Sequence, residues 1–420
     1  MRLLLRIGRH GFIFAAAKSA VLIAPLLAAS MLTQAQYGSV EWWLALSMAL
    51  GPVIGFGAPS VVAYGSVSRQ LQRHVRTATV CVLAIAIALV FFAFLMPLLG
   101  RDWAHYFYGP VALQCAVVIQ QMTLAARLKG TGKGAWASVA ESTLYLCLLL
   151  ALLSKLMGAG FIAAFVFWMV VASVLLAVGL VALVRVPSLW RWPNRNFKAC
   201  LAVGWRFMLG AALMAGFMAT PRIALGFLAP AETVAAFALV FRWLSISIIA
   251  HQFINTVFFA HIYGDVSERR RDIAIAIVIS VVASGALLIV LFLALGQGLL
   301  PFQLPFPHEK VLFLPMAMVM VMWAMTACLE GSLYRQGSAL KQSFAVVMGL
   351  SVMLLILAAN VMSVQDALLG MTYAWMGGLL VLIAVQFWRL GQHRPLISGM
   401  TFCVWLSLFI TLNIVQQGWA

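Results

Sequence analysis

Three basic residues lie inside long apolar stretches of the chain, at Lys18, Arg206 and Arg242. A cation at the centre of a membrane-spanning helix costs about 2.5–3.5 kcal/mol on insertion scales, so each is a functional candidate whose chemistry would be to bind an anion. Arg242 is the deepest, roughly 15 Å into its stretch; pairing with a helix carbonyl or a Glu is its structural alternative. Lys18 and Arg206 lie roughly 9 Å from one end, where their long stems can also reach the membrane interface.

Other polar residues inside apolar stretches could bind cargo or carry a coupling proton. His251 and Asn255 are four residues apart, so on a helix they share a face and form either a hydrogen-bonded pair or a polar cavity wall. Glu141 and Glu330 are the candidates for coupling. Their structural alternatives are ion pairs, with a basic helix end for Glu141 and with Arg335 for Glu330.

The six cysteines indicate packing rather than chemistry. None forms a C-x-x-C pair, and none has a histidine at ligand spacing. We therefore expect small buried side chains at these positions. No metal site and no cofactor is predicted.

The elements that must position these residues are membrane spans. The chain is 65% hydrophobic and 9% charged, with a mean hydropathy of +1.06, a composition that excludes a soluble protein. A span needs roughly 20 apolar residues. Thirteen segments satisfy this requirement: 12–32, 40–64, 77–99, 105–126, 135–156, 160–184, 200–220, 232–260, 272–298, 311–333, 343–362, 366–388 and 396–416.

Basic residues predict the orientation of these spans. Of the 27 Lys and Arg residues, 20 lie on alternate connections between spans, and such residues stay on the cytoplasmic side. We therefore predict a multi-pass protein of the cytoplasmic (inner) membrane with its N-terminus in the cytoplasm. The net charge of +17 is explained by connections that face anionic membrane lipids. No nucleic-acid partner is expected.

A basic interruption divides the predicted spans. Residues 185–199 carry two prolines, two tryptophans and four cations, which suits an interfacial cytoplasmic linker. This predicts an all-α fold with an N-terminal six-helix lobe at 1–184 and a C-terminal six-helix lobe at 200–390. Weak similarity between the halves indicates two lobes related by a pseudo-twofold axis along the membrane normal. Residues 391–420 would add a thirteenth helix.

Two stretches carry a resemblance to a known family. Residues 25–65 include a Tyr-Gly pair and a run of small residues and prolines, and residues 203–243 include Arg-Phe and Pro-Arg-Ile motifs followed by a glutamate. The positions are Tyr37, Gly38, Gly51, Pro52, Gly55, Gly57, Pro59, Arg206, Phe207, Pro221, Arg222, Ile223 and Glu232. In these features the chain resembles Wzx-type polysaccharide (O-antigen) flippases, of the superfamily that also includes multidrug and toxin extrusion transporters.

The resemblance implies a transporter for cell-surface polysaccharide synthesis, such as that of lipopolysaccharide. Its cargo would be a polyprenyl-pyrophosphate-linked saccharide, moved from the cytoplasmic to the outer leaflet by alternating access. Partners would include a polysaccharide polymerase and glycosyltransferases. Cationic side chains suit an anionic cargo, so the expected binding residues are Arg242, Lys18, Arg206, Arg222, His251 and Asn255. Arg222 would lie in the outward connection 221–231.

Three alternatives remain open at the level of sequence. One is a structural or scaffolding membrane subunit, against which the intramembrane cation Arg242 argues. A multidrug or toxin exporter of the same fold would need acidic residues facing a cationic cargo, whereas the first span offers Lys18 and no carboxylate. A membrane-embedded polysaccharide polymerase or ligase would need a substantial outward loop with catalytic residues. The outward connections are short and their polar residues scattered, so we expect no enzyme activity.

Overall fold

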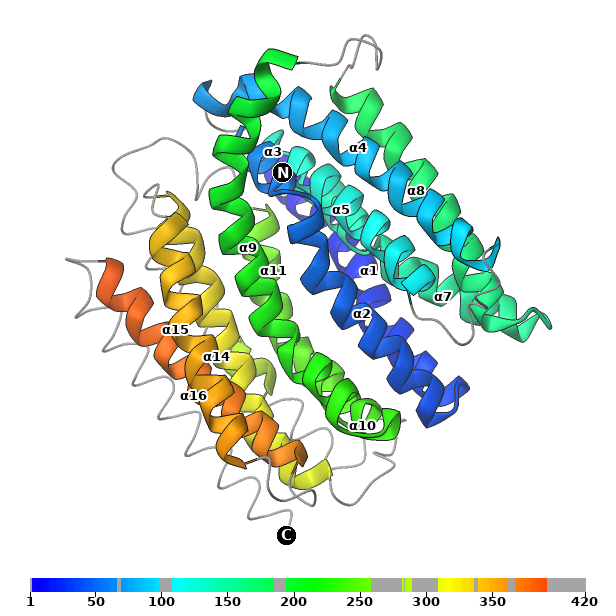
Figure 1. Cartoon of the computed structure of the whole chain (residues 1–420), viewed down its shortest axis with the longest axis vertical. Helices are drawn as coiled ribbons and strands as arrows, with labels where there is room; N and C mark the ends of the chain where they lie inside the picture. Colours follow the sequence, from blue (N-terminus) through cyan, green and yellow to red (C-terminus); the bar gives the residue numbers. More distant parts are fainter. Residues whose placement is uncertain are drawn as a thin grey trace. The chain divides into compact units, whose positions relative to one another are not determined.

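The structure is a computed structural model that describes residues 2–65, 69–98, 108–184, 194–257, 282, 284–288, 309–335, 339–360 and 367–390. Within these ranges every regular element is a helix (Figure 1). Nine of the described helices are long and apolar enough to cross a membrane, or ten if one bent pair counts as a single span. The chain is thus an all-α, multi-pass membrane protein, as predicted.

The chain divides into two compact units, the first comprising Met1–Gly226 and Thr256–Asp265 and the second Phe227–Asn255 and Val266–Ala420. In the first unit α5 is central, because it packs against most of the neighbouring helices. Of its most apolar 18-residue stretch, 83% is buried. The helices with residues in this unit are α1 (Arg2–Met31), α2 (Gln34–Ile54), α3 (Ala58–Gly65), α4 (Arg69–Leu98), α5 (Tyr108–Gly130), α6 (Gly134–Glu141), α7 (Thr143–Leu156), α8 (Phe161–Val184) and α9 (Asn194–Leu228).

In the second unit the central helix is α14, which packs against α10, α15 and α16. Stacked and tilted rings of Phe237, Phe241, Trp323 and Trp375 tie α10, α14 and α16 together. The described elements are α10 (Ala231–Leu244), a 3-10 turn (Ser245–Ile248), α11 (Ile249–Val257), α14 (Glu309–Arg335), α15 (Ala339–Asn360) and α16 (Ala367–Leu390).

Some predicted spans cannot be compared with the structure. The thirteenth span at 396–416 and most of the ninth at 272–298 lie outside the described residues, as does most of the linker at 185–199. The division into lobes at 1–184 and 200–390 therefore stays a prediction.

The second predicted span, at 40–64, is broken in the stretch that contains its glycines and prolines. Helix α2 ends at Ile54 and α3 begins at Ala58, and between them Gly57 has φ +69°. A Cβ at Gly57 would overlap the backbone of α9 at Gly204 and Met208, so only glycine permits this approach. The break brings the turn at Gly57 against the backbone of α9.

The fifth predicted span, at 135–156, is bent rather than straight. Helices α6 and α7 meet at Ser142 with a bend of 50°. The bend leaves the N–H of Leu144 without a helical acceptor, and the side-chain oxygen of Gln121 on α5 accepts this hydrogen bond at 3.2 Å. In hydrocarbon a broken helix needs such a partner for each freed backbone group.

The seventh span extends beyond its predicted end at residue 220. Helix α9 continues through Pro221 to Leu228. Arg222 was predicted in an outward connection, but it lies within the helix and is buried. The proline misled the prediction, because its effect on a helix can be offset by packing with neighbouring helices in a membrane.

Candidate functional site

A group of three charged side chains joins α1, α5 and α6. Glu141 at the end of α6 accepts an ion pair from Lys18 of α1 at 3.2 Å and one from Lys129 of α5 at 2.5 Å. The three side chains are 10–25% exposed. We call Lys18, Lys129 and Glu141 the α1–α5–α6 cluster.

The cluster keeps a positive charge. It contains two ammonium groups and one carboxylate, so one positive charge is not neutralised within it. Charges in a partly buried, low-dielectric setting interact more strongly than in water. The cluster can therefore attract an anionic group, and Glu141 holds the two ammonium groups close to each other.

A second ion pair joins α2 to α9. The guanidinium of Arg222 donates to Glu41 at 3.1 Å, and the hydroxyl of Tyr37 donates to the other carboxylate oxygen of Glu41 at 3.4 Å. Glu41 is completely buried. A carboxylate there is tolerable only because it is paired and hydrogen-bonded.

Neighbouring contacts hold α9 against α2 beside this pair. The indole N–H of Trp42 donates to the carbonyl of Ile223 at 3.3 Å. A Cβ at Gly226 would overlap the Trp42 ring, so the glycine allows the ring to lie against the α9 backbone. Arg222 and Glu41 are therefore built into a close helix contact.

Arg242 lies in the second unit, near the end of α10, and is 4% exposed. Its guanidinium lies 5.7 Å from the centre of the Phe241 ring, within the range of a cation–π contact. The next turn is a 3-10 turn, in which the hydroxyl of Ser245 donates to the carbonyl of Arg242 at 2.7 Å. Arg242 is thus buried at a change of helix geometry, about a dozen residues from the start of α10.

His251 is also buried, and its Nδ1 lies 3.2 Å from the Sγ of Cys328 on α14. The predicted partner on the same face, Asn255, lies on α11, but its side chain is outside the described part of the structure. Among the described residues no cluster of histidines, cysteines and carboxylates suits a metal ion.

The remaining sequence candidates are Arg206 and Glu330. Arg206 is exposed, with its guanidinium 5.9 Å from the Trp205 ring centre, consistent with a side chain that reaches the interface. Glu330 on α14 is partly buried, and the side chain of its predicted partner Arg335 is not among those described. The structure therefore brings the candidates Lys18 and Glu141 together in one ion pair.

Glutamines provide hydrogen bonds between helices within each unit. Gln120 of α5 accepts a hydrogen bond from Ser173 of α8 at 2.8 Å. Its neighbour Gln121 accepts the hydrogen bond from the N–H of Leu144 described above. In the second unit the amide of Gln386 donates to Gln342 at 2.9 Å, joining α16 to α15. Such bonds between membrane helices explain buried amides without a role in transport.

Sequence reasoning gave no role to Glu41 or Lys129. Glu41 lies one helical turn after Tyr37 inside an apolar stretch, a spacing that could have flagged a polar face. Lys129 was assigned to the predicted basic cytoplasmic side. Its contact with Glu141 depends on the packing of α5 against α6, which local spacing does not specify.

No model of a protein family matches the chain, and no curated protein sequence matches it. Solved structures do match over nearly the whole length. The chain is similar to the MATE transporter ClbM in complex with Rb+, at 18% identity and a TM-score of 0.53, with 95% of this chain and 96% of that chain covered.

Two further matches have higher TM-scores. A MATE protein in the straight conformation has 14% identity and a TM-score of 0.61, with 94% of this chain and 96% of that chain covered. The lipid II flippase MurJ in an inward closed conformation has 9% identity and a TM-score of 0.59, with 96% and 98% covered. The chain therefore has the fold that is common to MATE transporters and the MurJ flippase.

Proposed function

We propose that this protein is a flippase for a lipid-linked oligosaccharide or polysaccharide precursor. It takes an anionic polyprenyl-pyrophosphate-linked saccharide from the cytoplasmic leaflet of the inner membrane and releases it on the outer side by alternating access. The product supplies polymerases, glycosyltransferases or ligases that build a surface polysaccharide such as O-antigen.

The observation that carries this proposal is the excess positive charge of the α1–α5–α6 cluster. Lys129 is in the last turn of α5, next to the turn that is predicted to be cytoplasmic. A pyrophosphate in the cytoplasmic leaflet lies at this level of the membrane. Lys18 and Lys129 both pair with Glu141. When cargo arrives, some of these contacts can be replaced by hydrogen bonds from the two ammonium groups to the pyrophosphate oxygens.

Arg242 is the proposed contact for cargo deeper in the membrane. It is buried in the second unit, at roughly half the depth of a 30 Å hydrocarbon layer from the start of α10. A buried cation at that depth compensates part of the cost of moving an anionic head through hydrocarbon. The proposed role of Glu141 is to form its ion pairs with Lys18 and Lys129 again after the pyrophosphate has left them.

Export of a cationic drug is the second candidate, favoured by the similarity in fold to MATE proteins. A cationic cargo would need a carboxylate that is not already neutralised. Glu41 and Glu141 are each paired with basic residues in the described structure. This pairing favours the anionic cargo.

One experiment separates the two candidates. Cells lacking the protein would be analysed for saccharide lipids on the cytoplasmic leaflet and for their sensitivity to cationic drugs. A flippase predicts accumulation of one saccharide-linked polyprenyl lipid and unchanged sensitivity. Increased drug sensitivity with no accumulated lipid would refute the proposal in favour of drug export.

A further inference from the structure

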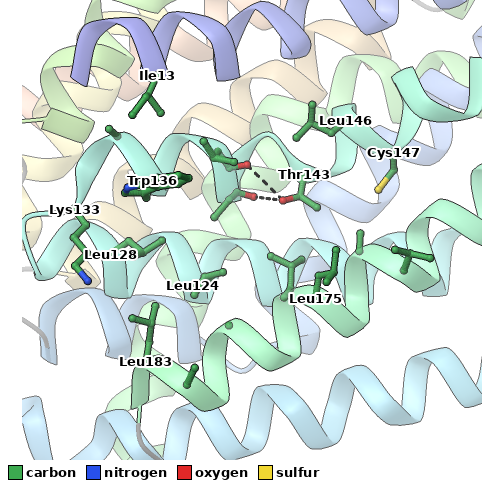
Figure 2. Close-up of a pocket in the computed structure, with 18 of the residues that line it drawn as sticks. Ile13, Leu124, Leu128, Lys133, Trp136, Thr143, Leu146, Cys147, Leu175 and Leu183 are labelled. Atoms are coloured by element: carbon green, nitrogen blue, oxygen red, sulfur yellow. Dashed lines mark hydrogen bonds between the residues drawn. The ribbon is translucent and has the colours of Figure 1, made fainter. Parts of the chain in front are cut away.

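An apolar groove of about 720 Å³ runs between α5, α6, α7 and α8 in the first unit. Figure 2 shows Lys133 and Trp136 near one end of this groove and Cys147 near the other, with Leu124 and Leu175 along its walls. Its residues come mainly from the two arms of the bent fifth span and from α8. The bend therefore shapes the groove.

Away from the end at Lys133 and Trp136, the few polar side chains of the wall are hydrogen-bonded within the protein. The Thr143 hydroxyl donates to the carbonyl of Ala140 at 2.8 Å, and the Trp168 indole donates to Ser154 at 3.1 Å. The Cys147 thiol lies 3.4 Å from the carbonyl of Trp168. A wall without free donors along its length suits a hydrocarbon chain and not a polar ligand.

The groove is longer than one leaflet of the membrane. Along α8 it is lined from Trp168 to Leu183, which corresponds to roughly 22 Å, or about 21 Å along the membrane normal at a typical tilt of about 20°. One leaflet contributes about 15 Å, half of the hydrocarbon thickness. A chain that fills the groove therefore extends past the mid-plane, farther than the acyl chains of a bilayer phospholipid.

One end of the groove carries a basic group. Lys133 lines it, is exposed, and has no ion-pair partner within the described part of the chain. Trp136, at 55% exposure, lies one helical turn farther along. Lysine and tryptophan are typical of the headgroup layer, and the lysine complements one phosphate.

We propose that this groove binds the polyprenyl chain of an anionic lipid carrier, with Lys133 as a further contact for the pyrophosphate, in addition to the α1–α5–α6 cluster. The inference rests on the proposed function and adds a site for the tail of the cargo. The anionic headgroup and the chain longer than one leaflet distinguish this ligand from bulk phospholipid. The tail could remain in the groove while the head moves across the membrane.

The test uses purified full-length protein in vesicles of phosphatidylglycerol that contain a trace of polyprenyl phosphate with a photoreactive group on its distal isoprene units. We expect labelled peptides within 135–150 and 168–183. Ala182→Trp places a large ring in the groove from an exposed position and should remove most of this labelling. Val178→Trp is the matched control, because Val178 is 61% exposed on the same helix and does not line the groove.

A second pair of variants tests the headgroup. Lys133→Ala should lower the labelling about fivefold, the effect expected from one lysine attracting an anionic lipid at the surface. Lys198→Ala, which removes an exposed cation at the start of α9, should leave it unchanged. Equal labelling in Lys133→Ala and wild type would contradict the assignment of the phosphate to Lys133.

Other outcomes overturn the proposal. Labelling that falls outside the groove, or that photoreactive phosphatidylglycerol reproduces equally well, would show that no polyprenyl site exists there. If cells lacking the protein still accumulate saccharide lipid, the proposed function stands and only the tail site fails. If no lipid accumulates, the flippase function itself fails, whatever the labelling pattern.

Discussion

Buried charges in this protein are arranged in two ways. Glu41 and Arg222 neutralise each other, whereas the α1–α5–α6 cluster keeps one positive charge. A neutral buried pair is well suited to fixing helices, and a cluster with a net charge is suited to meeting a partner of opposite sign. The same residue types thus form a neutral pair at one position and a positively charged cluster at another, and the proposed role in cargo binding falls to the cluster.

Arg242→Ala should abolish export of the saccharide lipid while protein levels stay normal. The physical reason is the loss of the buried positive charge that offsets the cost of an anionic head in the membrane. Accumulated saccharide lipid and surface polysaccharide would be measured together. Arg242→Lys should restore part of the activity, because it keeps the charge.

The control for Arg242 is Lys341→Ala, which removes an exposed cation from α15 of the same unit. Its export should equal that of the wild type. Normal export by Arg242→Ala would remove Arg242 from the proposed cargo path.

Arg222→Met should destabilise the protein by about 3–5 kcal/mol, because it leaves Glu41 charged and buried without its cationic partner. The double variant Glu41→Gln with Arg222→Met should recover part of this loss, since no buried charge remains unpaired. Thermal unfolding of the purified protein would measure both. Additive effects of the two substitutions would show that the ion pair does not couple α2 to α9.

At the scale of elements, two predicted spans are bent at specific points. Each bend has a compensating contact: Gly57 allows the backbone of α9 to approach, and Gln121 accepts the freed N–H of Leu144. A helix in hydrocarbon bends only where such partners exist. The bends shape the contact of the Gly57 turn with α9 and the groove beside α6 and α7.

Gly57→Ala should lower the melting temperature more than Gly132→Ala. Both glycines have positive φ, +69° and +74°, so an alanine at either costs about 1–2 kcal/mol in backbone strain. Only at Gly57 would the new Cβ also overlap another helix, whereas nothing lies within 4 Å of a Cβ at Gly132. Equal melting temperatures would show that the turn at Gly57 and α9 are not in close contact.

At the scale of the whole molecule, the distribution of basic residues predicts which turns face the cytoplasm. The turns at Gly132 and Gly158 are both exposed and lie at opposite ends of the bent fifth span. The basic neighbours of Gly132 assign it to the cytoplasm. Gly158 should then face outward.

Cysteines introduced at these two turns test that topology. In intact cells an impermeant thiol reagent should label Gly158→Cys but not Gly132→Cys, and opening the cells should allow both to react. The four described native cysteines are buried or partly buried. Labelling of the chain without an introduced cysteine therefore measures the background reaction. Labelling of Gly132→Cys in intact cells would reverse the predicted orientation.

Hydropathy and basic residues predicted the fold class and most of the described spans. Each signal is local: about 20 apolar residues are needed to cross the membrane, and charge decides which side a connection occupies. The same local signals identified Lys18 and Arg242 as cations out of place, and both are buried in the structure. The break after Ile54 lies where Gly55, Gly57 and Pro59 follow one another closely, a grouping that favours an interruption of a helix.

Tertiary structure decided the partners. Lys18 and Glu141 are 123 residues apart and Glu41 and Arg222 are 181 apart, and no helical spacing predicts contacts at such separations. The continuation of α9 through Pro221 and the groove beside the bent fifth span likewise depend on packing against other helices. Sequence alone determined which residues must be in the membrane, because burial of apolar surface and exclusion of charge act locally. Only the packed helices decided which charges in the membrane neutralise each other and where a positive charge remains, because contacts between distant segments form only on packing.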